Sequence, residues 1–181
     1  MTTRLLHSLA DTLDLAVVLP PAGLELHMVA IHEAGHAVAA VELNIPVSDV
    51  TVTRHNGGVV MLASNPRGTK DVVVSLAGPI AESILLQSYQ IALDVLVVGC
   101  ELDIRDAWQS TAGSRGRRVA HFIRLYEATR RLVTQRWPAV LELAGHLVER
   151  RFMPANEVYA VLRAEPTEIT WFLEPFERAK G

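Results

Sequence analysis

The stretch MVAIHEAGHAVAAVEL, residues 28–43, carries two histidines four positions apart within an apolar, proline-free run. The run from Leu24 to Leu43 is rich in Ala, Val, Leu and Glu, and Asn44 and Pro46 follow it. This pattern predicts a mostly buried helix. On a helix, side chains four positions apart differ by about 40° in direction and about 6 Å in height, so both imidazoles can reach one ion.

The residue types in this helix are those of a catalytic zinc site. His32 and His36 offer two nitrogen ligands, and a catalytic zinc ion needs one more protein ligand and a water molecule. Glu33, beside the first ligand, can serve as the general base toward that water. The alternative is a buried helix with two core histidines. It is disfavoured because each imidazole and the carboxylate would then need its own buried partner.

Spacing alone leaves the third ligand open. The candidates are the carboxylates of Glu82, Asp94, Glu101, Asp103 and Asp106 and the imidazole of His55. We interpret the histidines outside the helix motif as structural or surface residues, namely His7, His27, His55, His121 and His146.

The rest of the chain predicts a mainly α fold with one small β-hairpin or sheet, in the α+β class. Within residues 47–64, Val alternates with Thr over 50–53, Asn56-Gly57 signals a tight turn, and an apolar run resumes over 59–62, which indicates a hairpin. A helix from about Lys70 meets Pro79, which either kinks it or begins a second helix. Further helices are expected from about residue 102 and over 116–135, 138–151 and 156–164, with a short amphipathic helix over 3–15. Residues 90–101 fit strand or helix, and Trp171 and Phe172 are expected to dock the tail on the body.

Composition narrows the partners and the compartment. The 181 residues suit one domain, and the net charge of −3 provides no basic surface for nucleic acid. The single cysteine, Cys100, suggests a reducing compartment, so we expect a cytoplasmic protein. The most apolar stretch, VVVSLAGPIAESILL at 72–86, is too short to cross a bilayer and contains Glu82. We therefore expect a soluble chain.

Four segments in order resemble the peptidase domain of the FtsH family of zinc metalloproteases. VAIHEAGHAVAA resembles that family's zinc helix, and PVSDVTVTRHNGGVVML resembles the strand and turn that follow it. VSLAGPIAESIL is similar to the family's LAG-R-AAEEL helix, and LDIRDAW is similar to its NDLERAT segment. A weaker likeness covers residues 132–162, so that together the matches span most of 24–164.

The resemblance implies a single zincin-like helical peptidase domain over residues 1–181. It also indicates which residue is the third metal ligand. Asp103 takes the place of the family's aspartate ligand, which gives a Zn²⁺ site of His32, His36 and Asp103 with Glu33 as the base. Glu82 would orient a ligand or brace the site, and the alternative is a surface or capping carboxylate. The expected parts of the domain are an N-terminal extension at 1–23, a zinc-site half at 24–112, C-terminal helices at 113–164 and a docked tail at 165–181.

This sequence departs from the family pattern around the site. Pro79 stands where the family has arginine, Ser83 replaces the second glutamate, and Leu102 replaces the asparagine before the ligand. Additional residues, QIALDVLVVG at 90–99, lie ahead of Asp103. These changes concern the outer shell and the entrance of the site more than its three ligands.

The sequence has no G-x-x-x-x-G-K phosphate loop, so we expect an ATP-independent endopeptidase that acts on peptides, unfolded proteins or flexible segments. The alternative is a proteolytically inactive FtsH-like zinc-binding or regulatory module. HEAGH with LAGP also resembles the intramembrane site-2 proteases. We favour FtsH because site-2 chemistry needs a metal site within membrane-spanning helices, which this sequence does not predict. The sequence makes no prediction about the oligomeric state.

Overall fold

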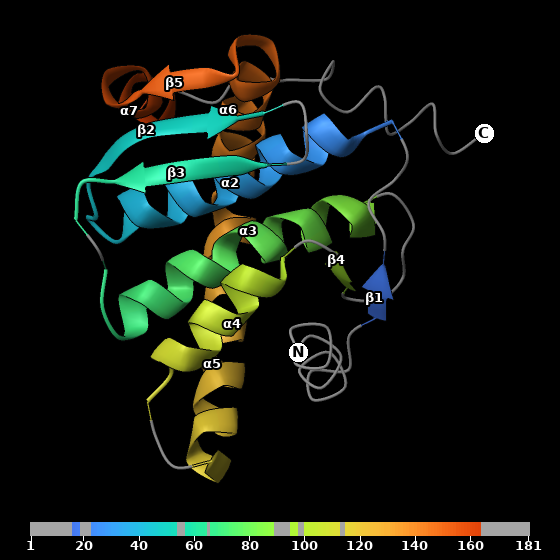
Figure 1. The fold of residues 1–181 in the computed structure, drawn as a ribbon, viewed down its shortest axis with the longest axis vertical. Coiled ribbons are helices and arrows are strands. Elements are labelled where there is room, and N and C mark those ends of the chain that lie inside the picture. Colours follow the sequence, from blue (N-terminus) through green and yellow to red (C-terminus); the bar gives the residue numbers. More distant parts are fainter. Residues whose placement is uncertain are drawn as a thin grey trace.

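The computed structural model describes residues 16–18, 23–53, 57–64, 66–88, 95–97, 100–112 and 115–163. Within these ranges the fold is mainly helical with two small sheets, which confirms the predicted α+β class (Figure 1). The helices are α2 (Glu25–Glu42), α3 (Thr69–Ser88), α4 (Glu101–Ser110), α5 (Arg115–Gln135), α6 (Trp137–Arg150) and α7 (Ala155–Arg163). The strands are β1 (Ala16–Val18), β2 (Val47–Val52), β3 (Gly58–Leu62), β4 (Val95–Val97) and β5 (Phe152–Pro154).

Helix α2 forms the centre of the core. It packs against α3, α6 and β2, and buried residues occupy most of its length from Met28 to Ala40. A helix that is apolar on nearly all sides needs cover on all sides, which these elements supply. It ends at Glu42; Asn44, two residues later, has a φ of 56°, and Pro46 follows.

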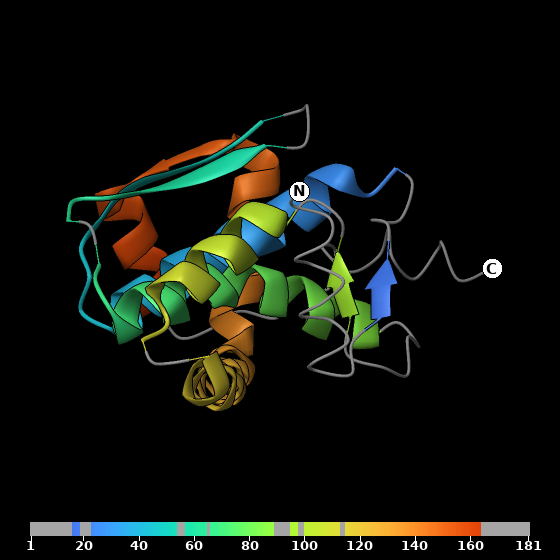
Figure 2. The ribbon, with the colours of Figure 1, turned by 60° about the horizontal axis from the view of Figure 1, so that its bottom comes forward.

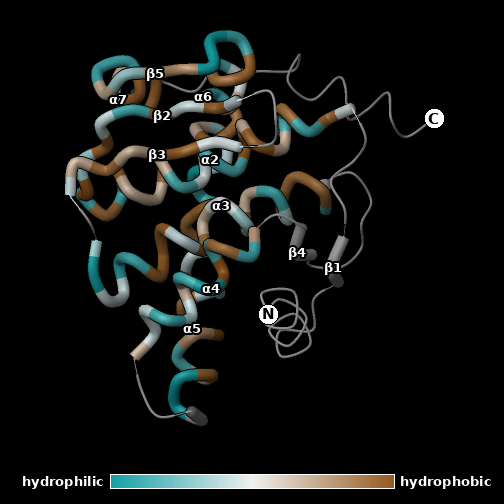
Figure 3. The backbone as a smooth tube through the Cα atoms, viewed as in Figure 1, coloured by the Kyte–Doolittle hydropathy of each residue, from teal (hydrophilic) through white to brown (hydrophobic). Residues whose placement is uncertain are grey.

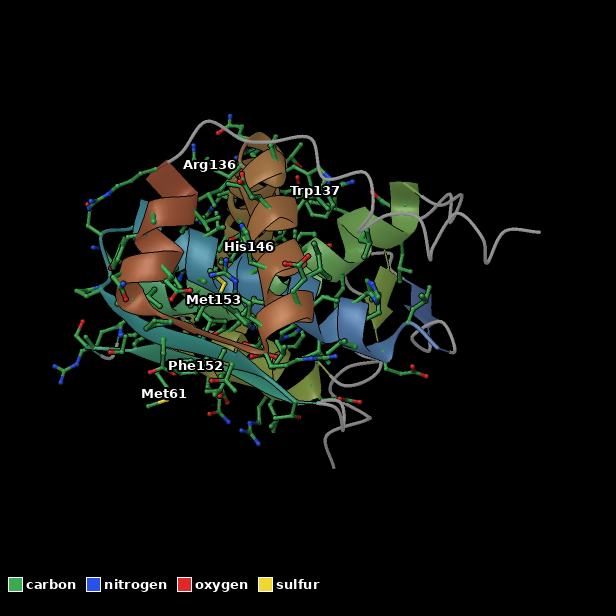
Figure 4. All side chains as sticks on the ribbon, turned by 90° about the horizontal axis from the view of Figure 1, so that it is seen from above. Met61, Arg136, Trp137, His146, Phe152 and Met153 are labelled. Carbon is green, nitrogen blue, oxygen red and sulfur yellow. The ribbon has the colours of Figure 1, made fainter. Side chains whose placement is uncertain are left out.

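The predicted hairpin forms as β2 and β3, which pair in antiparallel fashion, and the turn residues 54–56 lie outside the described ranges. Strand β5 adds to the other edge of β2, so the strand order is β3-β2-β5. On the inner face, Val50 pairs with Met153 and both are buried. Phe152 and Met61 are exposed on the outer face (Figure 4). The sheet therefore covers the helices with one side only.

Pro79 lies inside α3 without ending it. The helix runs unbroken from Thr69 to Ser88, so Pro79 does not begin a second helix. The missing proline N–H removes only the hydrogen bond to the carbonyl four residues earlier, and packing on both sides holds the remaining turns. Helices α2 and α4 both pack against α3, and α4 lies along it (Figure 2).

The last third of the described chain contains β5 and the helices α5, α6 and α7, and each of these helices lies within a residue of its predicted bounds. Hydrophobic and hydrophilic residues alternate along α5, as in a helix that buries one face (Figure 3). The predicted helix over 3–15 and the predicted docking of Trp171 and Phe172 lie outside the described residues. Within the described ranges, no helix has the length and apolar character that a membrane span requires.

Candidate metal centre

Two imidazoles from α2 face each other at the centre of the site. The Nε2 atoms of His32 and His36 lie 2.9 Å apart. Their ring centroids are 4.6 Å apart in an edge-to-face arrangement. His36 is buried and His32 is partly buried. The four-residue spacing on one helix face produces this convergence, as the sequence predicted.

A carboxylate from α4 completes the cluster. Asp103 lies in the first turn of α4, with Oδ2 3.2 Å from Nε2 of His32 and Oδ1 3.5 Å from Nε2 of His36. The three ligand atoms all lie within 4.8 Å of one another. Among the described residues, this is the one group of His, Cys, Asp or Glu side chains arranged to hold a metal ion.

The remaining third-ligand candidates do not join this group. Glu101 and Asp106 share α4 with Asp103 but are not part of it. Glu82 meets the far side of the His32 ring. Two other candidates, Asp94 and His55, lie outside the described residues, and so does His7. The histidines interpreted as structural or surface residues that the structure does describe are not part of the group, namely His27, His121 and His146.

Both imidazoles are oriented through their Nδ1 atoms. Nδ1 of His36 is 2.6 Å from the carbonyl oxygen of Val74, and Nδ1 of His32 is 3.4 Å from Oε1 of Glu82. Each ring therefore donates from Nδ1, which leaves Nε2 facing the centre of the cluster. Oε2 of Glu82 is buried without a hydrogen-bond partner in the described part of the chain.

The charges of the metal-free cluster follow from burial and close contact. Burial, aided by the charge of His32, lowers the pKa of His36 to about 4, so that ring is neutral. Burial opposes ionisation of Asp103, but its hydrogen bond with His32 and the nearby histidine charges hold its pKa below the usual range. Burial also disfavours a charged His32, yet Glu82 and Asp103 outweigh it and raise that pKa well above its ordinary value.

The cluster therefore requires a positive charge at its centre. Nε2 of His36 and the carboxylate of Asp103 both point lone pairs at Nε2 of His32, which satisfies them only as a protonated ring or by sharing a cation. A tetrahedral zinc ion, with bonds of about 2.0–2.2 Å, would space its ligand atoms about 3.3–3.5 Å apart. The observed separations of 2.9, 3.2 and 3.5 Å lie within a few tenths of an ångström of that spacing. Two imidazoles and one carboxylate thus fit a catalytic zinc ion.

Glu33 is buried next to this cluster. Burial raises its pKa to about 7, with the charge of His32 opposing the shift and those of Asp103 and Glu82 adding to it. A carboxyl group with a pKa near neutrality can both take up and release a proton at physiological pH. This is the property that a general base and acid requires.

Two glycines that the sequence analysis did not single out make room for the site. A Cβ on Gly78 of α3 would come within 2.5 Å of Nε2 of His36 and within 2.8 Å of the His32 ring. A Cβ on Gly58, at the start of β3, would overlap Cγ, Cδ and Oε1 of Glu33. The sequence offered one signal of this role, which is the presence of Gly78 inside a predicted helix. A glycine there lowers helix stability, so it is usually present because a neighbouring group packs closely against it.

Comparison with known proteins covers helix α2 but not the whole cluster. No curated protein matches the chain. A family model described as Peptidase M50B-like matches residues 7–93, a segment that contains His32, Glu33, His36 and Glu82 and ends before Asp103. This match does not confirm the assignment to the FtsH family, so the resemblance of the chain to that family remains a prediction. Residues 7–93 are thus similar to a family of zinc metallopeptidases, that of the site-2 proteases.

Proposed function

We propose that this chain is a zinc-dependent metallo-endopeptidase that hydrolyses peptide bonds in peptides or flexible protein segments without ATP. The observation that carries the proposal is the convergence of His32, His36 and Asp103, whose ligand atoms lie within 4.8 Å of one another. The similarity of residues 7–93 to a metallopeptidase family supports the reaction class.

Each polar residue of the cluster has a separate role in the proposal. His32, His36 and Asp103 hold the zinc ion, whose Lewis acidity makes water more acidic and polarises a scissile carbonyl. Glu33 takes the proton from the attacking water and passes it to the leaving amine. Glu82 accepts the Nδ1–H of His32, which fixes the tautomer that keeps Nε2 available.

Strand β3 supports a place for the substrate. Its first residue, Gly58, lies against Glu33, and β3 stands at the end of the strand order β3-β2-β5. One of its edges thus has no strand partner within the described part of the chain. A peptide in extended conformation can add to such an edge by backbone pairing, which would bring its carbonyl groups past Glu33.

The proposal keeps an FtsH-type arrangement for the third ligand. The Peptidase M50B-like match ends at residue 93, so it says nothing about α4. The FtsH resemblance extends to the segment LDIRDAW, and the contacts of Asp103 with both imidazoles support the role that this resemblance implies.

Zinc content and cleavage of an unfolded protein in ATP-free buffer test the activity. We expect the wild type to carry stoichiometric zinc and to cleave. Glu33→Gln should retain the zinc and lose on the order of 100-fold or more in rate, because it removes the general base. If the wild type carries zinc but cleaves no faster than Glu33→Gln on a broad substrate panel, the chain is a zinc-binding or regulatory module instead.

Two aspartates on α4 provide a matched pair for the ligand assignment. Asp103 contacts both imidazoles, whereas Asp106, three residues later, pairs with Arg105. Asp103→Ala should lose zinc while Asp106→Ala keeps it. The opposite result would assign the third ligand to Asp106.

A further inference from the structure

A two-stranded parallel sheet connects distant parts of the chain. Strand β1 pairs with β4 in the register Ala16–Val95, Val17–Leu96 and Val18–Val97. Strand β4 also packs against α3, which anchors the pair to the body (Figures 1 and 2). With three residues in each strand, such a pair is marginal by itself and depends on this support.

Both strands lead into the helices of the metal centre. Helix α2, which carries His32 and His36, begins seven residues after Val18, and α4, which carries Asp103, begins four residues after Val97. Because the strands are parallel, their carboxyl ends lie at the same edge of the sheet. The backbone pairing therefore ties together the two chain segments from which the ligand-bearing helices start.

Helix α4 packs against α3, and its first turn follows closely on β4 in the sequence. It has ten residues, of which Ile104 and Ala107 are the buried ones, and a helix of this length is marginal alone. Its last residue, Ser110, donates a hydrogen bond to Asp71, which holds the far end of the helix. Asp103 lies at the end nearer β4, two residues after the helix begins.

We propose that the β1–β4 pair is a positioning element for the metal centre. It holds the first turn of α4 against the body and so keeps the Asp103 carboxylate within reach of His32 and His36. The inference rests on the proposed function only in taking Asp103 as a metal ligand. Residues 16–18 and 95–97, which have no part in the chemistry, thereby set metal affinity from outside the site.

Proline substitutions in the full-length chain test this role. Ala16→Pro, Val17→Pro and Val18→Pro each remove a backbone N–H from β1, and Thr at the same positions keeps the N–H and the strand preference. In the zinc-free protein, we expect the proline set to lose hydrogen-exchange protection over α4 while α6 keeps its protection. Zinc affinity, measured by chelator competition, should fall about tenfold in at least one proline variant and stay unchanged in the threonine set.

Unchanged exchange over α4, or unchanged zinc affinity, in all three proline variants overturns the proposal. A covalent lock covers the case in which proline prevents folding. Paired Cα atoms in adjacent strands lie about 4.8 Å apart, which a disulfide can bridge, so Val17→Cys with Leu96→Cys should lock the pair on oxidation. Cys100 is buried and does not compete for the bridge. The oxidised form should release zinc to a chelator more slowly than the reduced form, and equal rates overturn the proposal.

These readouts separate the proposal from the peptidase function. A chain that binds zinc in the expected pattern but cleaves nothing supports the positioning role and contradicts the proposed function. A chain that cleaves through Glu33 with α4 exchange unaffected by all three prolines supports the function and contradicts the positioning role.

Discussion

At the scale of single residues, the site depends on the absence of side chains as much as on their presence. Gly78 leaves space for the two imidazoles and Gly58 leaves space for Glu33, and in both places a methyl group would overlap a functional side chain. At these distances the neighbouring side chains would have to shift, and they belong to the closely packed groups of the site. The two glycines therefore contribute to the site by leaving room for the imidazoles and for Glu33.

Gly58→Ala should impair catalysis without removing the metal. The new Cβ would overlap Cγ and Cδ of Glu33, so the whole carboxyl group must move, and all three of its nearest atoms belong to Glu33 rather than to His32, His36 or Asp103. We expect kcat/KM to fall by on the order of tenfold or more at unchanged zinc content. Gly57→Ala is the matched control, because among the described residues its Cβ meets only Oγ1 of Thr53, at 3.4 Å. Equal losses in the two variants would show that the effect comes from the turn and not from Glu33.

Asn44 offers a test of backbone strain at the end of α2. It is exposed with a φ of 56°, and its N–H bonds to the carbonyl of Val41 in the closing turn. Asparagine tolerates this left-handed conformation better than residues with a plain Cβ. Asn44→Ala should lower the free energy of unfolding by about 1 kcal/mol in a urea titration, whereas Asn44→Gly should not lower it. A stable alanine variant would mean that the turn relaxes.

At the scale of elements, the close crossing of α2 and α3 brings the two histidines to Gly78. A Cβ on Gly35 of α2 would lie 2.6 Å from the carbonyl oxygen of Ala77 and 2.9 Å from Cβ of Ala81. Small residues on both helices thus allow their backbones to approach. The glycine of the motif HEAGH thus has a packing role between α2 and α3.

Gly35→Ala should therefore destabilise the helix pair. The obstacle is backbone and a buried methyl group on α3, which cannot rotate away, so α2 and α3 must separate. We expect a loss of about 1–3 kcal/mol in the free energy of unfolding, as for other overpacked cores. Thermal and urea denaturation of the zinc-free protein measure it without a contribution from the metal. A variant as stable as the wild type would show that the crossing has slack.

Elements with a local signal could be predicted from the sequence, and those defined by a partner could not. Helix α2 and the β2–β3 hairpin follow from apolar runs and turn residues close together in sequence. Strands β1, β4 and β5 have three residues each, too few for alternation to appear, and they exist through pairing with distant segments. Pro79 was ambiguous because packing on both sides of α3 decides whether a proline ends a helix.

The residues of the site likewise differ in whether a local sequence signal or a tertiary contact determines their position. His32, Glu33 and His36 are adjacent on one helix, so their spacing alone predicted the convergence that the structure has. Asp103 and Asp106 share α4, and nothing in the local pattern says which of them faces α2. Only the resemblance to the FtsH family favoured Asp103, and tertiary contacts place it beside the histidines.

At the scale of the whole molecule, a bound metal would join two helices whose ligands are 67 residues apart in sequence, from His36 to Asp103. A ligand that binds only the folded arrangement stabilises it, so zinc should raise the unfolding temperature of the wild type and of Glu33→Gln. Asp103→Ala should show little increase. The metal and the packing of α4 on α3 then act on the same part of the fold.

Zinc binding should also release protons, with an affinity that falls as the pH falls. In the metal-free protein His32 has a pKa well above its ordinary value, so near neutral pH its ring carries a proton that must leave before Nε2 can bind the ion. Glu33, with a pKa of about 7, is partly protonated there too, and a nearby cation would drive off that second proton.

Calorimetric titrations at pH 6 in buffers of different ionisation enthalpy count these protons. We expect the wild type to release between one and two protons per zinc, and Glu33→Gln, which keeps all three ligands, to release about one less. Affinity should then drop by more than tenfold per pH unit in the wild type and by about tenfold in Glu33→Gln, because each released proton adds one power of the proton concentration. Zinc binding without proton release at pH 6 would show that the ring of His32 is already neutral, and that its contacts with Glu82 and Asp103 do not hold a positive charge at the centre of the cluster.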